Sequence, residues 1–153
     1  MQTVRLTASE EETERLGAEL AATLSSGDVV FLSGPLGAGK SAFARGVAGG
    51  LGEKNWLGSP TFTIVHEYDT RPFLYHIDLY RLSSESIVEL GLEDIFNSAS
   101  VALVEWPERA FDFLLSLTGN SHIWVQIDVS GPTSRQINIR RVEMNSDLRT
   151  GYQ

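Results

Sequence analysis

The sequence predicts an α/β fold in three layers, in which a mixed, mainly parallel sheet with β-hairpins lies between helices. Three observations predict it. The apolar segment 29–32 is typical of a central strand that is buried on both faces. A glycine-rich turn and a helical segment follow directly, so strand and helix alternate as they do around parallel sheets. Two pairs of β-branched and aromatic segments, each pair separated by turn residues, predict the hairpins.

The composition is that of one globular domain without cysteine chemistry. Of the 153 residues, 42% are hydrophobic and 21% are charged, as in ordinary folded proteins. The sequence contains no Cys, which excludes cysteine nucleophiles, iron–sulfur clusters and Cys-ligated zinc. It lacks an apolar run of about 18 residues and a leader pattern, so we expect a cytoplasmic protein with no membrane association. We expect residues 1–144 to form a single domain and residues 145–153 to form a flexible C-terminal tail.

Acidic residues are concentrated in two parts of the chain. The net charge is −8, from 12 Lys and Arg against 20 Asp and Glu. Residues 1–28 hold 2 basic and 6 acidic side chains, and residues 82–112 hold 1 and 7. Tight binding to a nucleic-acid backbone draws on Lys and Arg that neutralise phosphates, so this balance argues against it. We therefore expect any anion to be bound at a local site.

The N-terminal part predicts a short strand and an amphipathic helix. Residues 3–6 have strand character, and Ser9 and Glu12 have the spacing of a capping box at the start of a helix. Leucines then recur every fourth residue, as on the apolar face of a helix that ends near residues 25–27. These leucines are Leu16, Leu20 and Leu24.

The rest of the chain alternates strands, helices and turns. The strand at 29–32 precedes a helix over about residues 40–51. Acidic residues between 83 and 96 indicate one or two short helices, and the apolar residues 101–104 indicate another buried strand. Two hairpins complete the predicted elements. Their strands are expected at residues 61–68 and 73–80, and at residues 122–129 and 136–142.

Residues 34–41, GPLGAGKS, fit the phosphate-loop pattern G-x-x-x-x-G-K-[ST] between a strand and a helix. Glycines let successive backbone N–H groups converge on phosphate oxygens, and the N-terminus of the following helix points there too. The lysine adds a positive charge for the β- and γ-phosphates, and the serine hydroxyl is a ligand for Mg²⁺. The loop predicts a P-loop NTPase-like fold that binds a nucleotide with Mg²⁺. The residues expected at the nucleotide are Gly34, Gly37, Ala38, Gly39, Lys40, Ser41 and Ala42.

Two carboxylates are candidates for the chemistry of hydrolysis, which needs an acid near the Mg²⁺ and near the attacking water. Glu105 follows four apolar residues in VALVE, as a Walker-B acid does at the end of a buried strand. Asp78 lies within YHIDLY and is a candidate for orienting the water. Either carboxylate has an alternative role, which is to cap the turn after its strand. His66 and His76 face each other across the predicted hairpin, but a metal site there lacks a fourth ligand.

Five sequence blocks occur in the order typical of one family. They are GPLGAGKS, SPTF at 59–62, HIDLYR at 76–81, ELGLEDIF at 89–96 and VEWPER at 104–109. In these blocks the chain resembles the TsaE family of small P-loop ATPases, which act in the synthesis of threonylcarbamoyladenosine in tRNA. The flanking helix and the C-terminal hairpin fit as well, so the resemblance covers nearly the whole chain. Pro35 departs from the pattern, because the family usually has an acid there.

The resemblance implies roles for individual residues. Lys40 is implied to bind phosphate, and Ser41 and Glu105 are implied to bind Mg²⁺. Asp78 corresponds to the acid of the family's HxDxYR block. Thr61 corresponds to the threonine of its switch-like SPT segment. These residues are therefore expected to form the catalytic part of the site.

The resemblance also implies an ATP-dependent partner system. Arg135 falls where the family has an arginine near the nucleotide, and residues 9–13 resemble the segment near the base. ATP with Mg²⁺ is then the implied ligand, and turnover by the isolated protein is implied to be weak. The implied partners are TsaB and TsaD, the pair that attaches threonylcarbamoyl to the adenosine beside the anticodon. Contact with tRNA is implied to be indirect, through these partners.

Two alternatives remain open at this point. A P-loop small-molecule kinase transfers its phosphoryl group to a second substrate, and such kinases bring arginines to a lid and a substrate pocket. Between the phosphate loop and Glu105 the sequence has only Arg45, Arg71 and Arg81. In the other alternative, a non-catalytic binding module, ATP changes the shape of the protein and thereby its docking to a partner. A phosphorylated product would indicate the kinase, and assembly without phosphate release would indicate the module.

Overall fold

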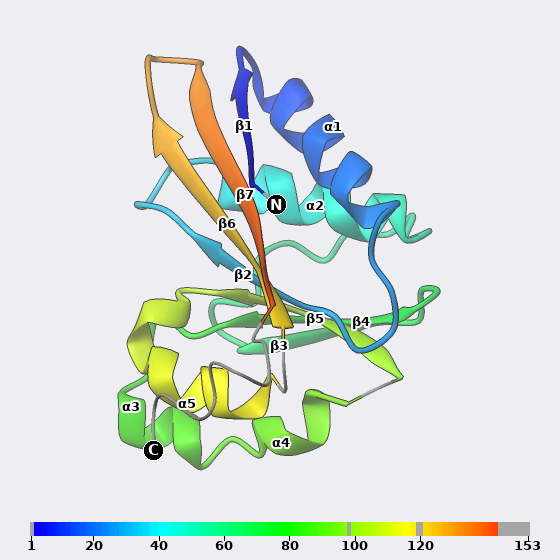
Figure 1. The fold of residues 1–153 in the computed structure, drawn as a ribbon, viewed down its shortest axis with the longest axis vertical. Helices are drawn as coiled ribbons and strands as arrows, with labels where there is room; N and C mark the ends of the chain where they lie inside the picture. The colour runs from blue at the N-terminus through cyan, green and yellow to red at the C-terminus, as the bar shows by residue number, and fades with distance from the viewer. Residues whose placement is uncertain (1, 98, 119–120, 144–153) are drawn as a thin grey trace.

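The computed structural model describes residues 2–97, 99–118 and 121–143, so the expected tail at 145–153 lies outside the described residues. Within these residues, seven strands form one sheet in the order β1-β7-β6-β2-β5-β4-β3 (Figure 1). The four central strands β6, β2, β5 and β4 are parallel. The strands are β1 Gln2–Thr7, β2 Val29–Ser33, β3 Val65–Tyr68, β4 Phe73–Asp78, β5 Ser100–Glu105, β6 Ser121–Val129 and β7 Arg135–Glu143.

The sheet is mixed, as predicted, and its antiparallel pairings lie at the two edges. Both predicted hairpins are confirmed: β3 pairs antiparallel with β4, and β6 pairs antiparallel with β7. β1 pairs antiparallel with β7 and forms one edge of the sheet. Parallel pairings among the described strands therefore number three of six, an equal share instead of the expected majority, because the two hairpins add two antiparallel pairs and β1 adds a third.

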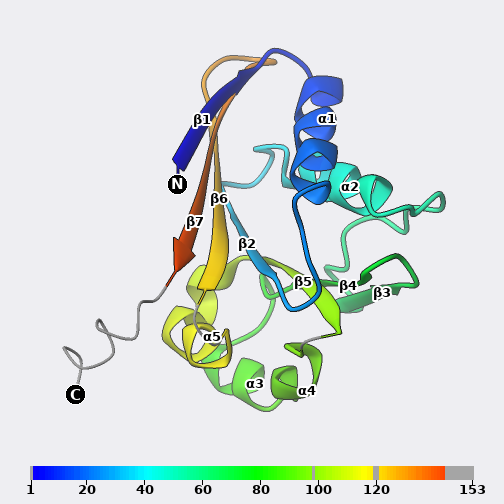
Figure 2. The same cartoon turned by 45° about the vertical axis from the view of Figure 1, so that its right-hand side comes forward.

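Helices cover both faces of the sheet and make the three predicted layers (Figure 2). α1 and α2 lie on one face, and α3, α4 and α5 lie on the other. Alternate residues of β2 enter the two cores: Val30 and Leu32 pack on the α1 and α2 side, whereas Val29 and Phe31 pack on the opposite side. No described helix has the length and apolar character needed to cross a membrane. The helices are α1 Glu10–Ala21, α2 Lys40–Gly50, α3 Ser84–Val88, α4 Leu92–Ile95 and α5 Phe111–Leu117, with the 3-10 helix η1 Pro107–Ala110 before α5.

The first helix begins as predicted and ends earlier. The hydroxyl of Ser9 accepts a hydrogen bond from the N–H of Glu12, which is the first half of the expected capping box. The helix ends at Ala21 and not near residues 25–27. Just after this end, the Thr23 hydroxyl donates a hydrogen bond to a backbone carbonyl of the last turn. Leu24 is nevertheless buried on the α1 side of the sheet, so the leucine pattern correctly indicated the buried face.

The other differences also have local causes. β3 begins at Val65, not near residue 61, because Ile64 has a left-handed backbone with φ of 70° that interrupts the strand. β4 ends at Asp78 because its carboxylate accepts a hydrogen bond from the N–H of Tyr80 and forms a turn. η1 and α5 were not predicted, and α5 begins after Ala110, an N-cap residue without a side-chain capping bond.

Glycines allow α1 and α2 to pack at short distance. A Cβ added at Gly46 would lie 1.9 Å from the carbonyl oxygen of Glu14. One added at Gly17 would lie 2.2 Å from the carbonyl oxygen of Phe43. Both distances are far inside van der Waals contact, so a residue with a side chain does not fit at either position. This packing places the N-termini of the two helices beside the same cavity, which is described below.

Gly46→Ala is expected to lower the free energy of unfolding by roughly 1–3 kcal/mol, because the added methyl forces the helices apart. Gly49→Ala is the matched control on the same helix, since a Cβ there meets nothing within 4 Å. It is expected to raise stability by up to about 1 kcal/mol, because Ala favours the helix over the unfolded chain. Urea unfolding followed by circular dichroism measures both. Equal stabilities of the two variants would contradict the close contact.

Candidate functional site

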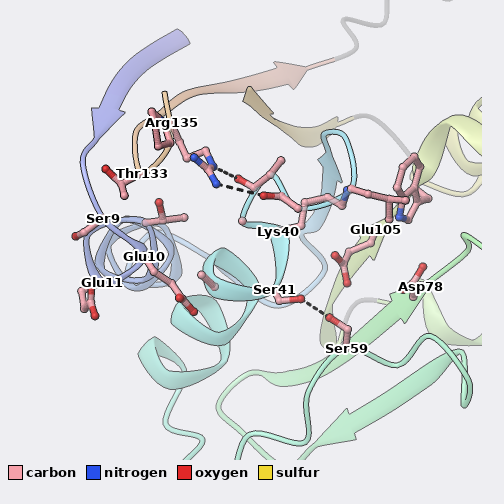
Figure 3. A pocket seen from close by; sticks show the side chains of 18 of the residues that line it. Ser9, Glu10, Glu11, Lys40, Ser41, Ser59, Asp78, Glu105, Thr133 and Arg135 are labelled. Atoms are coloured by element: carbon pink, nitrogen blue, oxygen red, sulfur yellow. Dashed lines mark hydrogen bonds between the residues drawn. The ribbon is translucent and has the colours of Figure 1, made fainter. Parts of the chain in front are cut away.

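A cavity of about 720 Å³ opens at the carboxyl ends of the parallel strands, beside the N-terminus of α2 (Figure 3). Ligands of open α/β sheets bind at this edge, where the connecting loops leave the strands. Of the predicted site residues, Gly34 alone is not part of the lining. The others, Gly37, Ala38, Gly39, Lys40, Ser41, Ala42, Thr61, Asp78, Glu105 and Arg135, all line the cavity.

The phosphate loop connects β2 to α2 through backbone conformations that favour glycine. Gly37 and Gly39 have φ of +76° and +103°, in the left-handed region. At Gly34 the reason is space, since a Cβ there would lie 2.6 Å from the carbonyl oxygen of Ile127 in β6. Gly39 is the N-cap of α2 and makes no side-chain capping bond. The N–H groups of the first helical turn therefore remain available to an anion.

The Lys40 side chain folds back onto the loop. Its Nζ donates to the carbonyl of Gly34 and, over 3.1 Å, to the carbonyl of Pro35. Nζ also lies 4.1 Å from the centre of the Trp106 ring. Only 7% of the residue is exposed, and this burial lowers the pKa of the ammonium, with nearby carboxylates, first among them Glu105, acting against the shift. The positive charge thus lies within the loop and is poorly solvated.

Two hydroxyl contacts connect the segment before β3 to the cavity. The hydroxyl oxygens of Ser41 and Ser59 lie 2.6 Å apart, as the dashed line in Figure 3 shows. The Thr61 hydroxyl donates to Oδ2 of Asp78 over 3.1 Å. Oδ1 of Asp78 accepts from the N–H of Tyr80 over 2.9 Å. Asp78 therefore caps the turn after β4, which was its alternative role, and also lines the cavity.

Glu105 ends β5 next to Asp78, with which it pairs across the parallel strands. The residue is 3% exposed, and its Oε2 lies 2.8 Å from Nε2 of the fully buried His76. The cavity thus places two carboxylates near the hydroxyl of Ser41. Carboxylate and hydroxyl oxygens are ligands that suit Mg²⁺, which binds through one or two carboxylates and keeps several waters.

A dedicated metal cage is absent from the part of the chain that the structure describes, since no three His, Cys, Asp or Glu side chains there gather around a common point. His66 and His76 do lie opposite each other in register, as the sequence predicted. The Nδ1 of His66, however, lies 3.1 Å from the carbonyl oxygen of Gly58, and Nε2 of His76 faces Glu105. The donor set at the cavity therefore fits a cation that takes some of its ligands from phosphate oxygens and water.

Arg135 connects the start of β7 to the phosphate loop. Its Nε donates to the carbonyl of Ala38 over 2.8 Å, and a terminal nitrogen donates to the carbonyl of Gly37 over 3.2 Å (Figure 3). Its other terminal nitrogen donates to the carbonyls of Gly131 and Ser134. The guanidinium therefore holds the loop in place while lining the cavity.

The sequence matches the family described as threonylcarbamoyl adenosine biosynthesis protein TsaE over residues 7–137. The chain belongs to the TsaE family. A relative in Treponema pallidum, a tRNA threonylcarbamoyladenosine biosynthesis protein TsaE, is 36% identical over 132 residues, which are 86% of this chain and 95% of the relative. A protein of the same name in Bacillus subtilis is 46% identical over 101 residues, which are 65% of this chain and 63% of that protein.

The TsaE assignment agrees with the fold. The crystal structure of Bacillus subtilis YdiB is similar with a TM-score of 0.77 at 31% sequence identity. The similarity covers 100% of this chain and 97% of the YdiB chain. The predicted α/β, P-loop NTPase-like architecture is therefore confirmed.

The lining of this TsaE cavity includes residues that were not among the predicted site residues. Ser59 was noted only as part of SPTF, although its hydroxyl contacts Ser41. Trp106, which has a left-handed backbone with φ of 59°, lies under the Lys40 ammonium. The motif blocks were a signal for both, since SPTF also contains Thr61 and VEWPER also contains Glu105. The remaining such residues are Ala8, Ser9, Glu10, Glu11, Thr13, Leu36, Pro132 and Thr133, among which those at 9–13 belong to the segment that resembles the family's base-proximal region.

Proposed function

We propose that this TsaE-family chain binds ATP with Mg²⁺ and hydrolyses it in support of the tRNA threonylcarbamoyladenosine modification system. The observation that carries the proposal is the single cavity that joins the phosphate loop to Ser41, Asp78 and Glu105. A P-loop that faces strand-end carboxylates is the arrangement that holds a triphosphate and directs water at its γ-phosphoryl group. The names of the relatives support the role in this modification pathway. We further propose that the chain acts together with partners of the TsaB and TsaD type.

Each group at the cavity has a separate task in this proposal. The backbone N–H groups of the loop and of the first turn of α2 bind phosphate oxygens, and the Lys40 ammonium neutralises their charge. Ser41 and Glu105 would hold Mg²⁺, Glu105 through water. When bound, Mg²⁺ offsets the negative charge that develops on the phosphate oxygens. Asp78, fixed by Thr61, orients the attacking water.

The kinase alternative finds little support at the cavity. Among the described lining residues the only arginine is Arg135, whose N–H groups donate to loop carbonyls. A second anionic substrate and the phosphoryl group in transit need further positive charges. The non-catalytic switch uses the same ATP site, so only the fate of the phosphate separates it from an ATPase.

Phosphate release by the purified chain, alone and with TsaB and TsaD, tests the proposal. We expect slow release of phosphate and ADP by the isolated chain and faster release with both partners. ATP-dependent assembly without phosphate release would contradict hydrolysis and favour the switch, and a phosphorylated small molecule would favour the kinase. Depletion of the protein in its host is expected to lower threonylcarbamoyladenosine in tRNA, and unchanged modification would contradict the pathway. Steeply salt-dependent binding of tRNA to the isolated chain would contradict indirect contact with tRNA.

Arg135→Gln is expected to weaken ATP binding roughly tenfold, because the loop carbonyls of Gly37 and Ala38 lose charge-assisted hydrogen bonds that hold the phosphate cradle. Arg140→Gln is the matched control, since Arg140 lies exposed on the same strand and its substitution removes the same charge. Isothermal titration with a non-hydrolysable ATP analogue measures both. An equal effect of the two changes would show that net charge, and not the loop contact, matters.

ATP affinity is expected to fall at alkaline pH as the pH rises through the lowered pKa of Lys40. Below that pKa the ammonium is already charged, and binding is at full strength. Above it, binding requires the neutral amine to take up a proton from the solvent, so the dissociation constant rises by up to about tenfold for each pH unit. The change begins at lower pH than for an ordinary lysine, whose pKa is 10.5. Titrations from about pH 7.5 to 10 test this, with Lys40→Ala expected to show no such dependence.

A further inference from the structure

His76 is a buried polar side chain at the centre of the sheet. It lies on β4, is 0% exposed, and stacks on the Trp56 ring with 5.3 Å between ring centres. Its Nε2 lies 2.8 Å from Oε2 of Glu105. Its Nδ1 is also buried and has no hydrogen-bond partner among the described residues. Burying an imidazole costs free energy unless its nitrogens are hydrogen-bonded, and here the bond of Nε2 to Glu105 is the one that offsets this cost.

The chemistry of the pair determines the direction of this hydrogen bond. The carboxylate of Glu105 only accepts hydrogen bonds, so the proton between the two groups belongs to Nε2 of His76. Nδ1 faces no acceptor among the described residues, so a proton there would be left buried without a partner. The arrangement therefore selects the neutral tautomer with hydrogen on Nε2.

We propose that His76 is the positioning residue for Glu105, an inference that rests on the proposed ATPase function. The ring is held by Trp56 and by burial, so its Nε2–H has a fixed direction. A hydrogen bond from it to Oε2 fixes the plane of the carboxylate and keeps Oε1 available for the water shell of Mg²⁺. Partners that orient a metal ligand in this way typically change metal affinity or activity by roughly 10- to 100-fold when removed.

The other two histidines of the chain differ from His76 in their hydrogen-bond partners. His66 lies opposite His76 in register, but its Nδ1 contacts the backbone carbonyl of Gly58. His122 is buried between Phe31 and Phe111 and has an Nδ1 without a partner among the described residues, as His76 has. Neither His66 nor His122 is hydrogen-bonded to a carboxylate in the described part of the chain. His122 thus shares the burial of His76 but not its proposed task.

Three substitutions of His76 separate positioning from packing. In His76→Gln the amide nitrogen reaches about as far as Nε2 and keeps a donor for Glu105, whereas in His76→Asn the same amide stops near the position of Nδ1. His76→Leu removes the donor and fills the site with an apolar side chain. We expect kcat for ATP hydrolysis to fall roughly 10- to 100-fold in the Leu and Asn variants, and to stay within a few-fold of wild type in the Gln variant. KM and magnesium-free binding of ATP are expected to change little.

A purely structural role predicts different results. It would lower the unfolding temperature of all three variants, leave the kcat of the folded fraction unchanged and give no advantage to Gln over Asn. His122→Leu is the control, because it removes a buried imidazole outside the cavity and is expected to lower stability without changing kcat. Full kcat in folded His76→Leu, or equal kcat in the Gln and Asn variants, would overturn the inference.

NMR of the nucleotide-free protein tests the contact without any ATPase measurement. The chain has 3 histidines, so long-range proton–nitrogen spectra of the imidazole rings are readily assigned with the variants. We expect His76 to show the neutral tautomer with hydrogen on Nε2, a proton that exchanges slowly with water, and an upfield shift of that proton in Glu105→Ala. A hydrogen on Nδ1, or no response to Glu105→Ala, would overturn the inference.

The two tests also separate this inference from the proposed function. If wild-type protein neither binds nor hydrolyses ATP under any partner condition, the proposed function fails, whatever the NMR spectra show. If wild-type protein hydrolyses ATP and His76→Leu retains its kcat, the positioning role fails and the ATPase stands.

Discussion

We expect Lys40→Ala to abolish ATP turnover and to weaken ATP binding by roughly 10- to 100-fold. The ammonium contributes charge-assisted hydrogen bonds to phosphate, each of about 1.5–3 kcal/mol, and every 1.4 kcal/mol corresponds to about a tenfold change in affinity. In the free chain its donors bond to loop carbonyls, and burial has already removed much of its water. A phosphate group therefore meets a poorly solvated positive charge. Phosphate release and calorimetric titration measure the two effects.

Lys54→Ala is the control for this change, because Lys54 is the other lysine of the chain and lies exposed away from the cavity lining. It is expected to hydrolyse and bind ATP like the wild type. Thermal unfolding establishes that both variants are folded. Full turnover by folded Lys40→Ala would be incompatible with the proposed phosphate-binding role of the loop.

Glu105→Gln is expected to retain ATP binding and to lose hydrolysis by roughly 100- to 1,000-fold, the scale for removing one group that stabilises transition-state charge. The amide has the shape of the carboxylate, and its oxygen still accepts from His76, so the packing of β5 is preserved. It lacks the negative charge with which Glu105 would hold the hydrated Mg²⁺. Binding to the loop depends on other groups, so affinity and turnover separate.

Single-turnover phosphate release with the partners present, next to binding of a non-hydrolysable analogue, measures this separation. Glu93→Gln is the control, because Glu93 lies exposed on α4 and outside the cavity and changes the net charge by the same amount. If Glu105→Gln and Glu93→Gln hydrolysed ATP at equal rates, Glu105 would have no role in the reaction.

Local patterns account for the parts of the fold that the sequence predicted well. The buried strands β2 and β5 follow from short apolar segments, and both hairpins follow from turn residues between β-branched segments. The phosphate loop is local too, because glycines at positive φ between a strand and a helix determine its course. The start of α1 at Ser9 is another such case, since a capping bond spans only three residues.

Elements with little local signal were missed or misplaced. η1 and α5 start without a side-chain cap, so Pro107 in the first turn of η1 was the main local sign of a helix start there. The end of α1 depends on a hydroxyl of Thr23 that competes for a helical carbonyl, which the leucine spacing does not report. The balance of parallel and antiparallel pairs depends on which strands meet across the sheet, which is a property of topology.

Short sequence patterns are enough to predict the phosphate loop and the strand-end acids, because the chemistry of each depends on neighbouring residues. The order of the five blocks is likewise enough to indicate the TsaE family. The contacts between groups that are distant in the sequence follow instead from the packing of the whole chain. Arg135 bonds to a carbonyl 97 residues away, and His76 bonds to a glutamate 29 residues away. Such contacts depend on strand order, on register and on the close packing of the helices, which arise only when the whole chain packs.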